Sequence, residues 1–242
     1  MMAETGFATY DEMIADPDWQ RRLRALNQAL WQSMAGLPEA ERCLNGNLFY
    51  AHKAPDFREA ALLPRFDIKR RNLFALAQRI ESFLEVGVNG GHSLFLALSA
   101  NPRLKVVGID VAERLHQSWA PVDLYVPEAF RWLDAAFPGR CTFIKGNSLV
   151  ELPRFALDHP DRRIDALHLD GSKETHLRET LAALPLMREG GFVIFDDANM
   201  APVGRAMQQV KQLGIGRPAD LSEAGIVPTP GHRIFELADA TG

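Results

Sequence analysis

Three aspartates stand directly after two apolar segments of the chain, at positions where acidic side chains could act together. Asp170 follows the segment 164–169, and Asp196 and Asp197 follow the segment 192–195. If both segments are strands of an open α/β sheet, their ends converge on one crevice. Crowded carboxylates raise one another's pKa unless a positive charge joins them, and Mg²⁺ prefers oxygen ligands. The pattern therefore predicts a magnesium site formed by Asp170, Asp196 and Asp197.

A glycine-rich segment upstream predicts a cofactor site. Residues 85–93 read Glu-Val-Gly-Val-Asn-Gly-Gly-His-Ser and continue an apolar run. Glycine permits a tight strand-to-helix turn and a close approach of a ligand to the backbone. The helix that follows would present free N–H groups to an anionic group. Asp110 ends the next apolar run, 19 residues after Gly91, where its carboxylate could accept hydrogen bonds from ribose hydroxyls.

The spacing of this turn separates two classes of cofactor. A dinucleotide turn has the pattern G-x-G-x-x-G, in which the middle glycine makes room for pyrophosphate. In this chain Asn89 takes the middle place and His92 the last. An NAD-dependent oxidoreductase is therefore kept only as an alternative. An acidic residue two positions before the first glycine, as Glu85 is, resembles the first motif of class I S-adenosylmethionine-dependent methyltransferases.

The resemblance extends over residues 82–238. The segment 143–148 is similar to the family's third-strand motif, whose end lies near the adenine, and the segment 184–191 is similar to its helix end and glycine turn before the fifth strand. The resemblance implies a doubly wound, mainly parallel seven-strand α/β sheet of the Rossmann-like class, with an antiparallel hairpin at its C-terminal end. It implies S-adenosylmethionine contacts at Glu85, Gly87, Asn89, Gly91, Ser93, Asp110, Asn147, Ser148 and Asp170.

Within this superfamily the chain resembles metal-dependent small-molecule O-methyltransferases of the catechol, caffeoyl-CoA and macrolide-sugar types. Their fourth strand ends in a metal-binding Asp and their fifth in Asp-Asn or Asp-Asp, which Asp170, Asp196 and Asp197 match. The catechol type has a lysine three residues after the first aspartate, the place of Lys173. Lys173 could remove the proton of a hydroxyl substrate if burial and the cation lower its pKa. His176 is a competing base, and His168, between two leucines, is interpreted as a core histidine.

The elements that would position these residues alternate along the second part of the chain. Apolar runs without polar alternation indicate strands covered on both faces, and helix-like segments between them predict a mainly parallel sheet. Two short runs around Pro228–Gly231 predict a closing hairpin with arms at 225–227 and 233–237. The predicted strands are 82–88, 105–111, 141–146, 164–170 and 192–195, and the predicted helices are 92–100, 127–137, 148–157, 174–188 and 203–213.

The first part of the chain reads as helical, which predicts an N-terminal cap over residues 1–80 and a cofactor-binding domain over 81–242. Apolar residues from Trp19 to Leu37 recur at steps of three and four, as on one side of a helix. We expect this apolar stripe to pack on the main core. A homodimer contact or a lid over the active site is the alternative that the sequence leaves open.

Composition limits the class of protein. The chain has 242 residues, of which 47% are hydrophobic and 24% charged, with a net charge of -4. This balance is typical of globular proteins, and it lacks the basic footprint of a nucleic-acid binder and any apolar stretch of membrane-spanning length. We expect a cytoplasmic enzyme that acts on a small hydroxyl compound, with neither nucleic acid nor membrane as partner. A metal-independent methyltransferase and a non-catalytic cofactor-binding module remain as alternatives.

Overall fold

The computed structural model describes residues 6–54, 57–116 and 118–238. The chain forms two compact units. The helical unit contains Met1–Gln78, Val88–Leu104 and Ala112–Thr142, and the sheet unit contains Arg79–Gly87, Lys105–Val111 and Phe143–Gly242, each within the described ranges. This division does not follow the predicted boundary at residue 80, because segments from 88–104 and 112–142 belong with the N-terminal helices. The boundary between 1–80 and 81–242 therefore stays a prediction.

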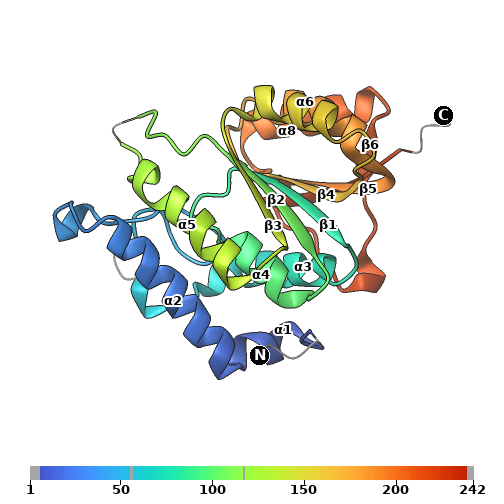
Figure 1. The fold of residues 1–242 in the computed structure, drawn as a ribbon. Coiled ribbons are helices and arrows are strands. Elements are labelled where there is room, and N and C mark those ends of the chain that lie inside the picture. Colours follow the sequence, from blue (N-terminus) through green and yellow to red (C-terminus); the bar gives the residue numbers. More distant parts are fainter. Residues whose placement is uncertain (1–5, 55–56, 117, 239–242) are drawn as a thin grey trace. The chain divides into compact units, whose positions relative to one another are not determined.

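A seven-stranded sheet with the order β3-β2-β1-β4-β5-β7-β6 confirms the predicted fold class (Figure 1). The pairs β1–β2, β1–β4 and β4–β5 are parallel, and β7 runs antiparallel to both β5 and β6. Four of the five apolar runs predicted as strands end within two residues of the observed bounds. The strands are β1 (Ser82–Val86), β2 (Lys105–Asp110), β3 (Cys141–Lys145), β4 (Ile164–Leu169), β5 (Met187–Asp196), β6 (Gly216–Pro218) and β7 (His232–Leu237).

The C-terminal strands correct one predicted element. The arm predicted at 225–227 is wrong, since the strand that pairs with β7 is β6, at Gly216–Pro218. A Cβ at Gly216 would lie 2.9 Å from the Glu236 carbonyl oxygen, so this close pairing requires glycine. Gly225 instead ends a short 3-10 helix (Ser222–Ala224) with a φ of 71°. The turn chemistry at 228–231 closes only an isolated bridge between Thr229 and His232.

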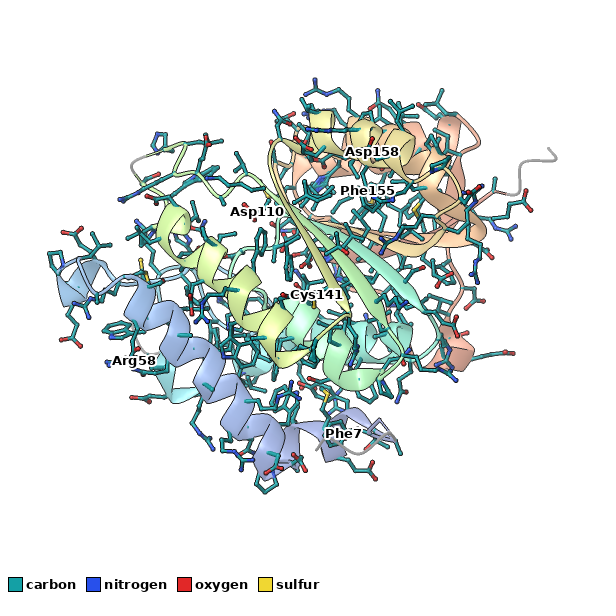
Figure 2. All side chains as sticks on the ribbon, viewed as in Figure 1. Phe7, Arg58, Asp110, Cys141, Phe155 and Asp158 are labelled. Carbon is teal, nitrogen blue, oxygen red and sulfur yellow. The ribbon has the colours of Figure 1, made fainter. Side chains whose placement is uncertain are left out.

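Helices of the sheet unit pack on the strands through an apolar core. They are α6 (Ser148–Asp158), α7 (His176–Ala183) and α8 (Ala201–Gln212). Phe155 lies on the side of α6 that faces the strands and is buried with Val107 and Ile109, whereas Asp158 is exposed at the end of the helix (Figure 2). α7 is shorter than the predicted 174–188, because the chain from Met187 already pairs with β4 and the glycines at 190 and 191 lie inside β5 as an irregularity.

The helical unit contains α1 (Tyr10–Ala15), α2 (Pro17–Ser33), α3 (Asp67–Ala77), α4 (His92–Ala100) and α5 (Val122–Ala136). The predicted apolar stripe lies on α2 from Trp19 to Leu30, and its last members, Met34 and Leu37, come after the helix has ended at Ser33. α2 packs against α5. Trp19 contacts the rings of Phe49 and Phe95, and Leu23 to Met34 of the stripe are at most 1% exposed. These side chains pack within the chain as expected, and they leave little of the stripe for a dimer contact or a lid.

Among the described residues, no helix combines the length and the apolar character that crossing a bilayer requires.

Candidate active site

The end of β1 places an acidic residue and a glycine against β4. Glu85 is fully buried and lies opposite His168 in the parallel register, so their side chains share one face of the sheet. The Glu85 Oε1 lies 2.6 Å from the His168 Nδ1, and the Glu85 Oε2 has no hydrogen-bond partner among the described residues. Its predicted contact with the methionine portion of a cofactor stays a prediction, and its observed partner is His168.

Gly87 permits the closest backbone approach in this region. Its φ is 87°, and a Cβ would lie 2.6 Å from the Gly171 nitrogen and 2.7 Å from the Asp170 carbonyl carbon. Both neighbours are backbone atoms, so they cannot give way as a flexible side chain would. The glycine that the sequence marked for a cofactor turn therefore also lets the ends of β1 and β4 lie in contact.

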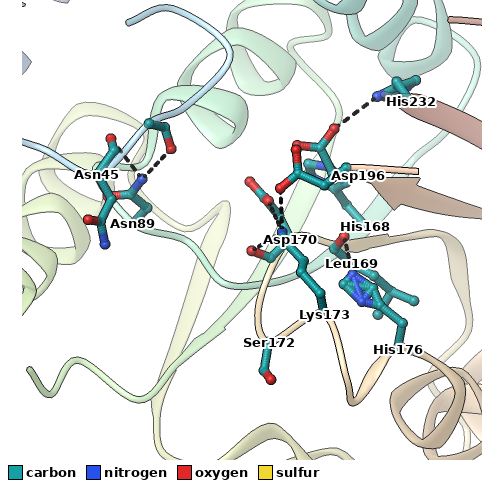
Figure 3. Close-up of polar contacts among 12 residues, drawn as sticks. Asn45, Asn89, His168, Leu169, Asp170, Ser172, Lys173, His176, Asp196 and His232 are labelled. Atoms are coloured by element: carbon teal, nitrogen blue, oxygen red, sulfur yellow. Dashed lines mark hydrogen bonds and ion pairs between the residues drawn. The ribbon is translucent and has the colours of Figure 1, made fainter. Parts of the chain in front are cut away.

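The remainder of the glycine-rich turn lies in the helical unit and is fixed by polar contacts. Asn89 has a φ of 52°. The Tyr125 hydroxyl donates to its Oδ1 at 2.6 Å, and its Nδ2 donates to the Gly46 carbonyl at 3.1 Å. The same Nδ2 lies 3.4 Å from the Asn45 carbonyl oxygen (Figure 3). Gly91, with a φ of 74°, packs against Leu133, and Ser93 is buried in the first turn of α4. Asn89 therefore connects this turn to the loop around Gly46.

His92 opens α4 and is buried in the helical unit. Its Nε2 lies 2.9 Å from the Asn27 Oδ1, and its Nδ1 lies 3.3 Å from the Asn47 Nδ2. Asn27 also donates to the Tyr50 hydroxyl and the Phe57 carbonyl. Burial lowers the pKa of His92 to about 3. The neutral imidazole therefore belongs to a structural network, as the position at the start of the helix suggested.

The pKa of His92 predicts a pH-dependent stability of the protein. The folded value lies below the usual 6.5 of an exposed histidine, so the unfolded chain binds more protons between these values. The stability that the buried neutral His92 contributes is fully present above pH 6.5 and is lost as the pH falls toward 3. We expect the free energy of unfolding to lose about 2 kcal/mol from this group between pH 8 and pH 5.

Urea unfolding of the wild type and of His92→Gln at both pH values measures this contribution. Glutamine is not protonated, so the variant should lose about 2 kcal/mol less stability than the wild type over the same range. Equal losses in the two proteins would show that His92 is not the group that titrates.

The ends of β2 and β3 carry three further predicted cofactor residues. Asp110 is partly buried, and its carbonyl accepts a hydrogen bond from the Gly146 nitrogen at 2.9 Å. Asn147 is exposed and caps α6 by accepting from the Leu149 nitrogen. The Ser148 hydroxyl donates to the Glu179 Oε1 at 2.6 Å. Glu179, buried on α7, was not predicted from the sequence, and burial raises the pKa of its carboxyl group.

The acidic centre at the ends of β4 and β5 differs in one member from the predicted set. Ligand atoms of Asp170, Asp196 and His168 all lie within 4.8 Å of one another. Asp197, with a φ of 51°, instead places its Oδ2 3.1 Å from the Lys173 Nζ. Lys173 also lies 2.8 Å from the Asp170 Oδ1 (Figure 3). The structure therefore brings together Asp170 and Asp196 as expected, adds His168, and pairs Asp197 with lysine.

Charge and burial shift the pKa values of this centre. Burial raises the pKa of Asp170 to about 6; Lys173 opposes the shift and Asp196 adds to it. Burial lowers the pKa of Lys173, but attraction to Asp170 and Asp197 outweighs it and leaves the pKa above its usual range. The expected shift toward neutrality is thus not found for the protein without a cation. Lys173 is a charged ammonium group that joins two carboxylates.

His176, the competing base, lies in the interior of the sheet unit. It is fully buried, its ring stacks on Phe195, and its Nε2 lies 3.2 Å from the Leu169 carbonyl oxygen. Burial and the charge of Lys173 lower its pKa to about 4. A side chain with no exposure is poorly placed to reach a substrate, which favours Lys173 over His176. Both catalytic roles stay predictions.

Comparison with known proteins finds one family model that matches the part of the chain containing this site. A family model described as a methyltransferase domain matches residues 84–198, which run from β1 to just past the end of β5 and include the acidic centre. This segment of the chain is therefore similar to a methyltransferase domain. No curated protein sequence matches the chain. The match agrees with the class I family that the sequence resembles and disfavours the NAD-dependent alternative.

Solved structures share the fold of this chain at low sequence identity. An O-methyltransferase from Bacillus cereus in complex with SAH is 16% identical, with a TM-score of 0.56, and the match covers 95% of this chain and 94% of that one. A TDP-rhamnose 3′-O-methyltransferase of calicheamicin biosynthesis is 17% identical, with a TM-score of 0.55 and coverage of 95% and 99%. A putative caffeoyl-CoA O-methyltransferase from Staphylococcus aureus is 16% identical, with a TM-score of 0.54 and coverage of 76% and 90%.

The ends of β4 and β5 provide ligand atoms that suit a divalent cation. Asp170 and Asp196 supply carboxylate oxygens, and the His168 Nε2 is buried without a hydrogen-bond partner among the described residues. His168 is buried and its Nδ1 is paired with Glu85, as expected for a core histidine, while the role of its Nε2 is not tested. The sequence could have indicated that His168 lies near Asp170. The two residues are two apart, and residues two apart on a strand point to the same face of the sheet.

Proposed function

We propose that this chain transfers the methyl group of S-adenosylmethionine to a hydroxyl group of a small molecule, with the help of a divalent cation. The observation that carries the proposal is the acidic centre with Lys173 at the ends of β4 and β5, inside a methyltransferase domain. The names of the structural neighbours support the O-methyl assignment, since each is called an O-methyltransferase.

The proposed cofactor contacts in the sheet unit begin at Asp110, whose carboxylate would accept hydrogen bonds from ribose hydroxyls. Gly87 leaves the backbone at the end of β1 open to close approach, because no side chain projects from it. Asn147 and Ser148 have observed structural partners in α6 and α7, so we expect them to contribute mainly through the backbone at the start of α6. Asn89, Gly91 and Ser93 remain the proposed contacts of the glycine-rich turn.

In the proposed chemistry the hydroxyl oxygen attacks the methyl carbon of S-adenosylmethionine in line with the sulfur, so that the O–C bond forms as the S–C bond breaks and S-adenosylhomocysteine leaves. A divalent cation bound at the acidic centre supplies Lewis acidity, which lowers the pKa of a coordinated hydroxyl. The Lys173 Nζ would accept the hydroxyl proton, and Asp170 and Asp197 hold this nitrogen in place. These two carboxylates raise the pKa of Lys173, so any charge that neutralises Asp170 favours the free amine that a base requires. Prealignment of the reacting groups lowers the barrier further.

A metal-independent methyltransferase is the second candidate, and one observation favours it. The ammonium group of Lys173 already provides a positive charge between Asp170 and Asp197. In that case the carboxylates would orient the substrate hydroxyl without a cation. Turnover measured before and after dialysis against a chelator separates the two candidates, because only the cation-assisted enzyme should lose activity and regain it on addition of a divalent ion.

Cofactor binding tests the proposed function directly. We expect calorimetry to show binding of S-adenosylmethionine to the wild type and an affinity at least about 10-fold weaker for Asp110→Ala, because a hydrogen bond to a charged group contributes about 1.5–3 kcal/mol. Asp158→Ala is the matched control, since Asp158 is an exposed aspartate at the end of α6 (Figure 2). Absence of binding to the folded wild type would refute the proposed function.

A further inference from the structure

His168 is a buried histidine at the centre of an acidic strip on the sheet. It lies on β4, is 4% exposed, and stands opposite Glu85 of β1. Asp170 lies two residues later, directly after the end of β4, where its backbone nitrogen still donates to the Val86 carbonyl of β1, and Asp196 ends the neighbouring strand β5. Side chains two apart on a strand point to the same face, which explains why His168 and Asp170 converge. The sheet thus places one imidazole among three carboxylates.

The two nitrogens of His168 have different surroundings. Nδ1 lies 2.6 Å from the Glu85 Oε1, whereas Nε2 is buried without a hydrogen-bond partner among the described residues. A buried polar atom without a hydrogen-bond partner lowers the stability of the folded protein by about 1–3 kcal/mol. A metal ion bound to the His168 Nε2 would remove this loss. A histidine that binds a metal ion through one ring nitrogen commonly donates a hydrogen bond from its other ring N–H to a carboxylate, which fixes the orientation of the ring. Glu85 is placed to do this for His168.

The distances between donor atoms fit an ion with little adjustment. One ligand atom each from His168, Asp170 and Asp196 lies within 4.8 Å of the other two. Three equidistant ligand atoms at about 2.1 Å from one ion are at most about 3.6 Å apart, so atoms separated by as much as 4.8 Å would each have to move by roughly 0.7 Å toward the ion. Lys173 occupies the Asp170 Oδ1, but a carboxylate has two oxygens. The His232 Nδ1 forms an ion-pair contact of 3.8 Å with the Asp196 Oδ1, and this carboxylate likewise has a second oxygen.

We propose that His168, Asp170 and Asp196 form a metal site with one nitrogen and two carboxylate ligands, which selects a first-row transition ion over Mg²⁺. Glu85 orients His168, and Asp197 stays with Lys173 outside the ligand set. Imidazole suits transition ions, whereas Mg²⁺ is usually bound through oxygen atoms alone. The inference rests on the proposed function only for the use of the cation, since the metal site itself requires neither cofactor nor acceptor.

Titration of the chelator-treated full chain with Co²⁺ and with Mg²⁺ tests this ligand set. We expect one equivalent of Co²⁺ to bind at least about 10-fold more tightly than Mg²⁺, with a visible absorption band from the bound ion. His168→Gln should weaken Co²⁺ binding by more than about 10-fold, while Mg²⁺ binding changes much less. Equal affinities of wild type and His168→Gln for Co²⁺ would overturn the inference.

Two adjacent aspartates provide a matched pair of variants. Asp196→Asn should weaken Co²⁺ binding by more than about 10-fold, whereas Asp197→Asn should leave the dissociation constant within about threefold of wild type. If Asp197→Asn weakened Co²⁺ binding and Asp196→Asn did not, the proposed ligand set would be refuted. Asp197 would then be a ligand, as predicted from the sequence. Circular dichroism of each variant confirms that it is folded before titration.

A measurement on the wild type avoids dependence on folding of the variants. Pulsed EPR of the Mn²⁺-loaded protein should detect coupling of the ion to a ¹⁴N nucleus, which only a nitrogen ligand produces. Bound Mn²⁺ without this coupling would mean that the ligands are oxygen atoms alone, and His168 would then serve as a charged partner of Glu85. That result would leave binding of S-adenosylmethionine, and with it the proposed function, unaffected.

Discussion

Gly87→Ala should lower the free energy of unfolding by about 2–5 kcal/mol, the largest stability effect that we expect from a single added methyl group. The new Cβ would lie 2.6 Å from the Gly171 nitrogen, and alanine would also have to adopt a φ of 87°. The first contact forces a backbone shift, and the second is sterically unfavourable for any residue with a Cβ. Urea unfolding followed by circular dichroism measures the change.

Gly139→Ala is a control that separates the two costs. Gly139 has a φ of 72°, but a Cβ there would meet nothing within 4 Å. This variant should lose only the conformational cost of about 1–2 kcal/mol. The displaced backbone in Gly87→Ala carries Asp170, so we also expect weaker binding of S-adenosylmethionine for that variant and an unchanged affinity for Gly139→Ala. Similar stability losses in the two variants would show that the contact with Gly171 is relieved at little cost.

Lys173→Met should reduce the turnover number by about 100- to 10,000-fold, the range typical for loss of a general base. The affinity for S-adenosylmethionine should change little, because Lys173 is proposed to act on the acceptor rather than on the cofactor. Lys173→Arg keeps the positive charge between Asp170 and Asp197 but cannot accept a proton near neutral pH. We therefore expect Lys173→Arg to be as impaired as Lys173→Met in single-turnover assays with a hydroxyl acceptor.

The arginine variant decides between two roles of Lys173. If it retained most of the wild-type activity, Lys173 would be needed for its charge and not as a base. Chelator sensitivity should be measured for the same variant. An active Lys173→Arg enzyme that is insensitive to a chelator would support the metal-independent candidate, in which lysine supplies the positive charge of the acidic centre.

The strands of the sheet could be predicted from the sequence because each one has a local signal. A strand covered on both faces must be apolar at successive positions, and the five predicted runs meet this condition. The C-terminal hairpin arm was harder to locate, since β6 has only three residues and its pairing depends on the distant Glu236. α4 was predicted at its observed position, 92–100, but all nine of its residues are buried, so its sequence does not indicate which side contacts which neighbour.

The sequence by itself determined the residue types of the candidate site and their places at strand ends: Glu85, Asp110, Asp170, Asp196 and Asp197, with Lys173 three residues after Asp170. Only the tertiary structure decided how they are paired. Asp197 forms an ion pair with Lys173, and His168 lies close to Asp170 and Asp196. Both arrangements result from the register of the strands and the conformation of the backbone, which set the direction of each side chain. Chain order records which residue follows a strand, whereas the distances that decide ligand and ion-pair partners arise between strands far apart in the sequence.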